Sequence, residues 1–281
     1  MGAPYCCAVS QFTWTSTVTT PHASIDNDSQ TMEQKSQIDE LKAMLSASKR
    51  AVVFTGAGVS TESGIPDFRS PGGIWTKYQP IDFREFMTSE EARRETWRRK
   101  IAVDEAVSIA QPNRGHRAIA HLVHTGKVSS VITQNIDGLH QRSGVPDNKV
   151  IELHGNGTYA ACLDCAKRYE LPEIFSAFLA NEDPPVCDCG GFIKSATISF
   201  GQPMPFEPMR RAQAESKACD LLLAIGSSLV VYPAAGFPAV AKQNGSKLVI
   251  LNREPTELDY LADLVLHLEI GPTLGEVTGV D

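Results

Sequence analysis

Ala51-Val52-Val53-Phe54-Thr55-Gly56-Ala57-Gly58-Val59-Ser60 is the stretch of this 281-residue chain that decides its fold. Its first half is a short apolar run, which is typical of a buried parallel strand. Glycines directly after such a strand let backbone N–H groups approach a pyrophosphate at the start of a helix. The third glycine of a dinucleotide fingerprint is missing, because Thr61 stands in its place, and no acidic residue closes a second strand about 20 residues on. The stretch alone therefore leaves a nucleotide site and a ligand-free glycine turn about equally open.

Similar apolar runs recur along the chain, and helical stretches separate several of them. The expected strands are 51–55, 128–133, 221–225, 248–251 and 264–266. The expected helices are 36–49, 115–124, 206–217 and 234–243. Strands that alternate with helices predict βαβ units and an α/β fold with a parallel sheet covered on both faces. Open sheets of this kind bind ligands at the carboxyl ends of their strands.

Two segments interrupt the alternation, and one precedes it. Residues 73–110 contain a charged helical stretch, and residues 158–194 hold paired cysteines, so we interpret both as insertions into the α/β frame. The frame would then comprise residues 35–72, 111–157 and 195–281. Residues 1–34 are rich in Ser, Thr, Asn and Gln without an amphipathic period, which predicts a disordered tail. An artefact of the start site is an equally open interpretation of that segment.

The bulk composition disfavours several classes of protein. A net charge of −7 provides no basic surface for phosphate backbones, so we expect no direct nucleic-acid binding. No apolar run approaches the ~18 residues of a membrane-spanning helix, so we expect no membrane partner. No Lys or Arg precedes Lys35, which disfavours secretory and mitochondrial leaders. We expect a cytoplasmic protein, or a nuclear one if the source is eukaryotic, and a monomer.

Four of the seven cysteines form two tight pairs, Cys162-x2-Cys165 and Cys187-x-Cys189, separated by 21 residues. Four thiolates in two pairs are what a closed tetrahedral zinc site needs. The second pair is one residue tighter than the usual knuckle, and Gly190-Gly191 directly after it would permit the sharper bend. We therefore predict a structural zinc ion, with an empty reduced cluster as the alternative. Cys219 is expected to be a small core residue.

Further candidate residues lie at or near the ends of the expected strands. Asp67-Phe68-Arg69 places an acid, an aromatic ring and a base on a Gly/Pro loop, and Gln134-Asn135-Ile136-Asp137 could bind a carboxamide and sugar hydroxyls. His154 titrates near neutrality, which suits a general base. Gly226-Ser227-Ser228 and Asn252 suit phosphate and ribose contacts. Each also has an ordinary interpretation: a surface ion pair, a turn, a structural histidine, or loop chemistry.

Taken in order from about Ala51 to Leu266, these motifs resemble the sirtuin family of NAD-dependent protein deacylases. The resemblance implies a Rossmann-like large domain with a small zinc-binding module and a helical insertion. NAD and acyl-lysine would enter the cleft between the domains from opposite sides. It implies removal of acetyl or another neutral acyl group from protein lysine, which yields nicotinamide and O-acyl-ADP-ribose. The alternatives are a protein mono-ADP-ribosyltransferase, a non-catalytic NAD-binding module and an ordinary NAD oxidoreductase.

The resemblance also implies a role for each matching residue. His154 would be the general base, and acylated-lysine proteins would be the partners. The expected NAD-binding residues are Gly56, Ala57, Gly58, Ser60, Asp67, Phe68, Arg69, Gln134, Asn135, Ile136, Asp137, Gly226, Ser227, Ser228, Asn252 and Arg253. The expected acyl-lysine and peptide-binding residues are Phe68, Ile198, Phe200, Gly201 and Val231. The expected zinc ligands are Cys162, Cys165, Cys187 and Cys189.

Two departures from the family pattern stand out. The family's acid after Phe-Gly is Gln202 here, so the edge that binds the substrate peptide is expected to differ without loss of catalysis. The residues after His267 do not follow the family's glycine-containing adenine loop, so no adenine contact is assigned to residues 268–271.

Overall fold

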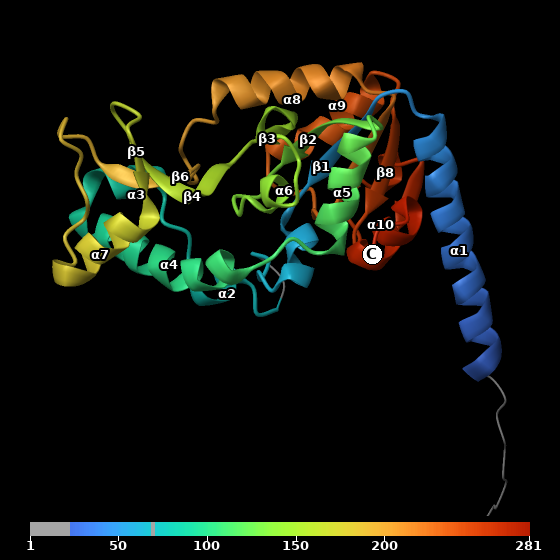
Figure 1. The fold of residues 1–281 in the computed structure, drawn as a ribbon, viewed down its shortest axis with the longest axis horizontal. Coiled ribbons are helices and arrows are strands. Elements are labelled where there is room, and N and C mark those ends of the chain that lie inside the picture. Colours follow the sequence, from blue (N-terminus) through green and yellow to red (C-terminus); the bar gives the residue numbers. More distant parts are fainter. Residues whose placement is uncertain (1–22, 69–70) are drawn as a thin grey trace, which may run out of the picture. The chain divides into compact units, whose positions relative to one another are not determined.

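A six-stranded, all-parallel sheet organises the part of the chain that this computed structural model describes, residues 23–68 and 71–281 (Figure 1). The strand order is β3-β2-β1-β7-β8-β9. The strands are β1 (Ala51–Thr55), β2 (Val128–Thr133), β3 (Val150–Glu152), β7 (Leu221–Ile225), β8 (Lys247–Leu251) and β9 (Leu264–Leu266). Neighbouring strands are parallel at every pairing. The predicted α/β class and the five predicted strands are confirmed. Within this parallel sheet, β3 is the strand that the sequence did not indicate.

Side chains of alternate strand residues enter two separate cores, one on each face of the sheet. Val53 belongs to the core beneath α5 (Arg114–His124) and α10 (Ile270–Thr278). Val52 and Phe54 belong to the core beneath α8 (Phe206–Ala218) and α9 (Phe237–Gln243). Because successive side chains of a strand point to opposite faces, a strand buried on both faces must be apolar throughout. That requirement explains why the strands read as continuous apolar runs.

Helix α1 (Ala23–Ala47) differs from the expectation at both ends. Residues 23–34, expected to be disordered, are helical, and the rest of the expected tail, residues 1–22, lies outside the described residues. The stretch from residue 31 contains many strong helix formers, which favour a helix without an apolar stripe. Because the first turns of α1 are polar all round, an apolar period does not reveal them. The chain divides into two compact units, residues 1–36 and residues 37–281. In the second unit, the predicted apolar positions Ile38, Leu41 and Leu45 are buried.

A second sheet, with strand order β5-β4-β6, holds the cysteine pairs. It is antiparallel and consists of β4 (Gly155–Cys162), β5 (Arg168–Glu170) and β6 (Ile193–Thr197). Strands β4 and β6 cross the expected boundaries at residues 157 and 195, so the expected zinc module begins and ends within strands of this second sheet. Turn residues 153–154 join β3 of the parallel sheet to β4. Helix α7 (Leu171–Asn181) packs on this sheet, and Cys219, predicted to be a small core residue, is buried in the core beneath α8.

The segment 73–110 forms three helices: α2 (Ile74–Lys77), α3 (Phe83–Thr88) and α4 (Glu90–Ile109). Asp82 and Ser89 cap the N-termini of α3 and α4 with side-chain oxygens. Trp97 of α4 is 1% exposed and belongs to the same core as Phe178 of α7 and Cys162. The helical insertion and the cysteine-bearing sheet therefore share one hydrophobic core.

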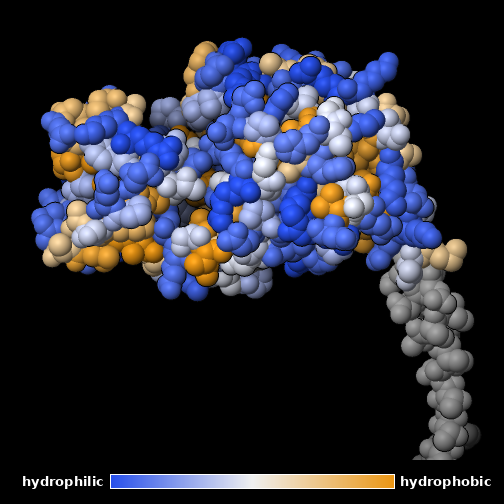
Figure 2. Space-filling view, viewed as in Figure 1, coloured by the Kyte–Doolittle hydropathy of each residue, from blue (hydrophilic) through white to orange (hydrophobic). Residues whose placement is uncertain are grey.

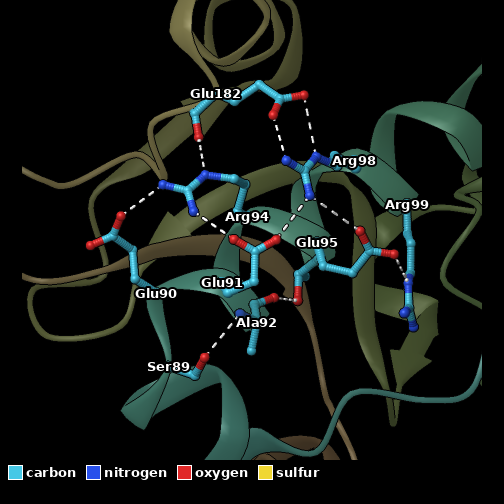
Figure 3. A network of polar contacts seen from close by, with 10 residues as sticks. Ser89, Glu90, Glu91, Ala92, Arg94, Glu95, Arg98, Arg99 and Glu182 are labelled. Carbon is cyan, nitrogen blue, oxygen red and sulfur yellow. Dashed lines mark hydrogen bonds and ion pairs between the residues drawn. The ribbon is translucent and has the colours of Figure 1, made fainter.

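The surface shown in Figure 2 is mostly hydrophilic, and apolar residues appear on it in small patches. Figure 3 shows a network of charges between α4 and the residue after α7. Arg94 and Arg98 of α4 pair with Glu91 on their own helix, and both donate to Glu182, which follows α7. Nowhere in residues 23–68 and 71–281 is a helix both long and apolar enough to cross a membrane.

Candidate functional site

A cavity of about 520 Å³ opens at the carboxyl ends of the parallel strands. Segments that follow β1, β2, β3, β7 and β8 all contribute to its wall. The strand order reverses direction between β1 and β7, since β2 lies on one side of β1 and β7–β8 on the other. Ligands of open α/β sheets bind at such a reversal, and the volume lies within the ~300–1,000 Å³ of known ligand sites.

Most of the residues expected from sequence line this one cavity. Those on its wall are Ala57, Gly58, Asp67, Phe68, Gln134, Asn135, Ile136, His154, Ile198, Phe200, Gly201, Gly226, Ser227, Ser228, Val231, Asn252 and Arg253. Gly56, Ser60 and Asp137 are not on the wall. Arg69 lies outside the described residues.

The glycines after β1 and β7 allow two loops to touch through their backbones. Gly58 N–H donates to the Gly226 carbonyl at 2.8 Å. A Cβ added to Gly58 would lie 2.8 Å from the Gly226 backbone, and one added to Gly226, whose φ is +63°, would lie 2.4 Å from Val59 N. A real Cβ cannot approach backbone atoms so closely, and Gly226 also needs the left-handed conformation. These glycines therefore serve the close contact between the two loops.

His154 follows β3 and is fixed by hydrogen bonds at its ring and at its backbone. Its Nδ1 lies 3.1 Å from the Gln134 carbonyl. A carbonyl oxygen only accepts, so Nδ1 carries the proton in the neutral ring and Nε2 keeps a lone pair. The backbone carbonyl of His154 accepts from Ile198 N–H at 2.8 Å. Burial lowers the pKa of His154, which the Gln134 bond partly opposes. The ring is therefore neutral and basic at physiological pH.

Ser60 and Asp137 form a buried polar cluster next to the wall residue Asn135. The Asn135 amide donates to Ser60 Oγ at 3.1 Å, and Ser60 in turn donates to Asp137 Oδ2 at 2.7 Å. Asp137 Oδ1 accepts from Leu139 N–H at 2.9 Å. Ser60 and Asp137 are 1% and 7% exposed, so each polar atom depends on its protein partners. In this geometry Asp137 is connected to the cavity wall by hydrogen bonds through Ser60 to Asn135.

An aromatic wall bounds one side of the cavity, and sequence reasoning found only part of it. The rings of Phe68 and Trp75 lie 5.6 Å apart, and those of Trp75 and Phe200 lie 5.5 Å apart. Trp75 belongs to α2 of the helical insertion and was not predicted to line the site. The sequence could have indicated Trp75 as a site residue, because it is an aromatic residue in a segment that has no apolar period. Phe83 N–H, at the start of α3, donates to the Phe200 carbonyl at 2.8 Å, so the insertion also fixes this wall.

The end of the cavity nearest β8 and α10 contains residues to which the sequence motifs assign no contact. Leu268, Glu269 and Ile270 line it together with Asn252 and Arg253. Arg253 pairs with Glu269 at 3.0 Å, and both side chains are exposed. Other wall residues that were not predicted are Thr61, Glu62, Thr197, Ser199, Gln202, Met204, Tyr232, Pro233 and Glu254. Leu268 and Glu269 precede α10, and Ile270 is its first residue. No recognisable sequence motif marks these three positions.

The four predicted cysteine ligands converge. Their sulfur atoms all lie within 4.8 Å of one another, with Cys162–Cys189 at 3.5 Å and Cys165–Cys187 at 3.6 Å. Tetrahedral zinc with Zn–S bonds of ~2.3 Å separates its sulfurs by about 3.8 Å, so the residues fit zinc. Gly190 has φ +89°, and a Cβ on Gly191 would lie 2.7 Å from Cys162 Sγ, which confirms that the tight second pair depends on these glycines.

Comparison with known proteins identifies the family. The family model described as Sir2 family matches residues 56–233. The chain belongs to the Sir2 family. This Sir2 family member is 56% identical over 245 residues to a protein of Bradyrhizobium diazoefficiens named NAD-dependent protein deacetylase 1, covering 87% of this chain and 96% of the relative. The resemblance drawn from the motifs is therefore confirmed.

Solved structures of Sir2 enzymes share its fold. One, described as Sir2 with a deacetylated p53 peptide and 3′-O-acetyl ADP ribose, is 36% identical with a TM-score of 0.80, covering 87% of this chain and 99% of the other. Another, described as bound to a propionylated peptide, is 35% identical with a TM-score of 0.76, covering 86% and 97%. The Sir2 family member thus matches these enzymes across both of its sheets.

Proposed function

We propose that this Sir2 family member removes acetyl or other neutral acyl groups from protein lysine with consumption of NAD, yielding nicotinamide and O-acyl-ADP-ribose. The observation that carries the proposal is the cavity itself. A neutral histidine with a free Nε2, glycine-rich strand ends and an aromatic wall meet there. The relative named NAD-dependent protein deacetylase 1 and the solved enzyme described with 3′-O-acetyl ADP ribose support it.

NAD would bind along the strand ends. The backbone after β1 and β7 and the Ser227 and Ser228 hydroxyls suit the phosphates, and Asn252 and Arg253 suit the adenosine half. Asn135, Ile136 and the Ser60–Asp137 pair behind them would form the nicotinamide pocket, and Arg69, outside the described residues, would belong to the same loop as Asp67 and Phe68. When bound, NAD supplies a sugar carbon whose bond to nicotinamide can be broken.

Acyl-lysine would enter along the aromatic wall. Phe68, Ile198, Phe200 and Val231 would surround the acyl-lysine side chain, and apolar walls suit a neutral acyl group better than an acidic one. The peptide would lie between Gly201 and Val231 as an added strand, a mode that recognises main chain more than side chains. The solved enzyme bound to a propionylated peptide supports acyl groups longer than acetyl.

His154 would act as the general base. With Nδ1–H held by the Gln134 carbonyl, Nε2 is the atom that can take a proton from a ribose hydroxyl. The lowered pKa keeps that atom unprotonated at neutral pH. The fixed backbone and ring place the base before substrate arrives, so little reorganisation is needed during the reaction.

The remaining assignments are also proposals. Zinc at the four cysteines would be structural, because four thiolates close the tetrahedron and leave no position for a substrate. Residues 35–72, 111–157 and 195–281 would form the large domain, with 73–110 as the helical insertion and 158–194 as the zinc module. We propose a cytoplasmic monomer that acts on acylated-lysine proteins and not on nucleic acid. The bacterial relative supports the location, and the small size of the apolar patches on the face that Figure 2 shows supports the monomer.

The proposed function is tested by incubating the zinc-loaded protein with NAD and a panel of acetyl-, succinyl- and myristoyl-lysine peptides. Nicotinamide release and peptide mass are followed together. Loss of one acyl group per nicotinamide is the expected result, with the acetyl peptide as a substrate and the succinyl peptide unchanged. Nicotinamide release without a peptide change would redirect the assignment to ADP-ribosyl transfer or NAD hydrolysis. No turnover at all would leave a binding module.

A further inference from the structure

Lys194 of β6 is a buried lysine that the cofactor, substrate and zinc sites do not use. Its side chain belongs to a residue that is only 3% exposed. Among the described residues, the groups within hydrogen-bond distance of Nζ are two backbone carbonyls, those of Thr197 at 2.6 Å and Ser195 at 3.4 Å. No carboxylate of the described chain forms an ion pair with it. A buried charge without a counter-charge is costly, so its presence calls for an explanation.

The stronger of the two bonds links Lys194 to the backbone that carries His154. The Thr197 carbonyl and the Ile198 N–H belong to the same peptide unit. Lys194 Nζ donates to that carbonyl, and the Ile198 N–H donates to the His154 carbonyl at 2.8 Å. A peptide polarised by a cation at its oxygen is a stronger donor at its nitrogen, so the two bonds reinforce each other.

The same peptide unit lies between the two sides of the cavity. Thr197 and Ile198 line the wall beside His154. The register pairs Gly155 with Thr197, and a Cβ on Gly155 would lie only 2.1 Å from the Ala196 carbonyl. The strand end after β6 is thus pressed against the segment that carries His154. A displacement of the Thr197–Ile198 peptide unit would therefore displace the backbone of His154.

We propose that Lys194 is a positioning residue for the base: its ammonium fixes the Thr197–Ile198 peptide unit, which in turn holds the backbone of His154. The inference rests on the proposed function for calling His154 the base. Burial lowers the pKa of Lys194 to about 8, which still leaves the ammonium form dominant at neutral pH. The structure thus retains a costly buried cation where it acts on the catalytic geometry rather than on stability.

The test compares Lys194→Met with Ser195→Ala, its neighbour on the same strand. Methionine keeps most of the volume and removes the charge and the donor. Ser195 Oγ is buried and has no hydrogen-bond partner among the described residues, so its removal is the matched control. Kinetics with NAD and an acetyl-lysine peptide give kcat and KM, thermal unfolding gives stability, and amide hydrogen exchange followed by NMR reports the Ile198 N–H.

Lys194→Met is expected to lower kcat by about tenfold or more with KM within about threefold, because a small displacement of a base costs rate rather than binding. Its melting temperature should equal or exceed that of the wild type. The Ile198 amide should exchange at least about tenfold faster, while the core amides of β4 keep their protection. Ser195→Ala should match the wild type in its kinetics, its melting temperature and the exchange rate of the Ile198 amide. An unchanged kcat, or a loss of kcat that merely follows a loss of folded protein, would overturn the proposal.

If Lys194→Met fails to fold, Lys194→Arg and Lys194→Gln are compared instead. If Lys194 positions the base through its charge, the Arg variant should have a higher kcat per folded molecule than the Gln variant. Equal kcat values for the two variants would overturn the proposal. If the wild type turns over none of the peptides, the proposed function fails, yet the Ile198 exchange rates still test whether Lys194 holds that peptide unit. The two failures are therefore distinguishable.

Discussion

The cavity at the strand ends and the α4–α7 face, which comprises the charged residues of α4 and Glu182 directly after α7, use charge in opposite ways. On α4, arginines and glutamates are numerous, exposed or partly exposed, and paired with one another (Figure 3). Beside the cavity, Ser60, Asp137, His116 and His140 are few, and each is at most 7% exposed. Exposed pairs are screened and contribute little to stability, whereas a buried polar group left without a partner is costly. The difference predicts that equal chemical changes have unequal effects in the two regions.

The largest effect is expected at the cavity wall with His154→Ala. Removing the base should lower deacylation by about 10²–10⁴-fold, because general base catalysis typically contributes that much. The melting temperature should remain near that of the wild type, since His154 is only partly buried. Turnover with an acetyl-lysine peptide and thermal unfolding check the two statements. Near-normal turnover in a folded variant would exclude His154 as the base.

A pH titration of stability should reveal the buried histidine pair. Burial lowers the pKa of both His116 and His140 below the usual 6.5, and their rings lie 5.1 Å apart. The folded state therefore binds fewer protons than the unfolded state once the pH falls below about 6.5. Stability should be full above that pH and fall progressively below it, by up to about 1.4 kcal/mol per pH unit for each histidine.

Urea unfolding at pH 7.5, 6.5, 5.5 and 4.5 measures this dependence, and His116→Asn should flatten it. The same slope in the variant as in the wild type would show that other groups, such as carboxylates, dominate the acid sensitivity.

A smaller effect is expected for Ser60→Ala in the buried cluster. The change leaves Asn135 Nδ2 and Asp137 Oδ2 without the hydroxyl that joins them. Each unsatisfied buried group costs about 1–3 kcal/mol, so unfolding should become easier by that order. Thr61→Ala, one residue on and only partly buried, is the matched control, because its hydroxyl bonds a carbonyl of its own turn. Equal stability of the two variants would mean that water replaces the lost hydroxyl of Ser60.

The smallest effect is expected on the α4–α7 face with Arg98→Ala. Arg98 contacts Glu91, Glu95 and Glu182, yet all four side chains are exposed to solvent. The melting temperature should fall by about 1 °C or less, and the difference should vanish in ~1 M salt, where the Debye length is ~3 Å. A large fall that persists in high salt would show that the network is a structural link between the insertion and the zinc module.

The contrast between the two regions also explains how far the sequence could lead. Val52, Val53 and Phe54 predicted β1 because burial on both faces requires a continuous apolar run. Strand β3 has only three residues, and β4 contains glycine and polar residues with irregular burial, so neither produces such a run. Helix α1 was predicted only where Leu41 and Leu45 form a stripe, and its polar first turns carry no such signal.

The site was predictable where a motif directly follows a strand, as for Gly58, Asn135 and Gly226. Trp75, Glu62 and Leu268 reach the cavity only because α2, the turn after β1 and the segment before α10 are brought there by tertiary structure. Lys194 was beyond prediction for a related reason: a lysine is ordinarily solvated, and the burial of Lys194 depends on packing that the chain order does not reveal.

The contact between Gly58 and Gly226 has a consequence for how this sequence can vary. The atoms that a Cβ on either glycine would approach most closely are main-chain atoms of the other loop. A second substitution therefore cannot make room for the first, because a backbone cannot be shortened. The two positions are constrained jointly yet cannot compensate for one another. In a saturation library, neither single nor paired replacements at these positions should survive, whereas positions that pack through side chains should tolerate matched pairs.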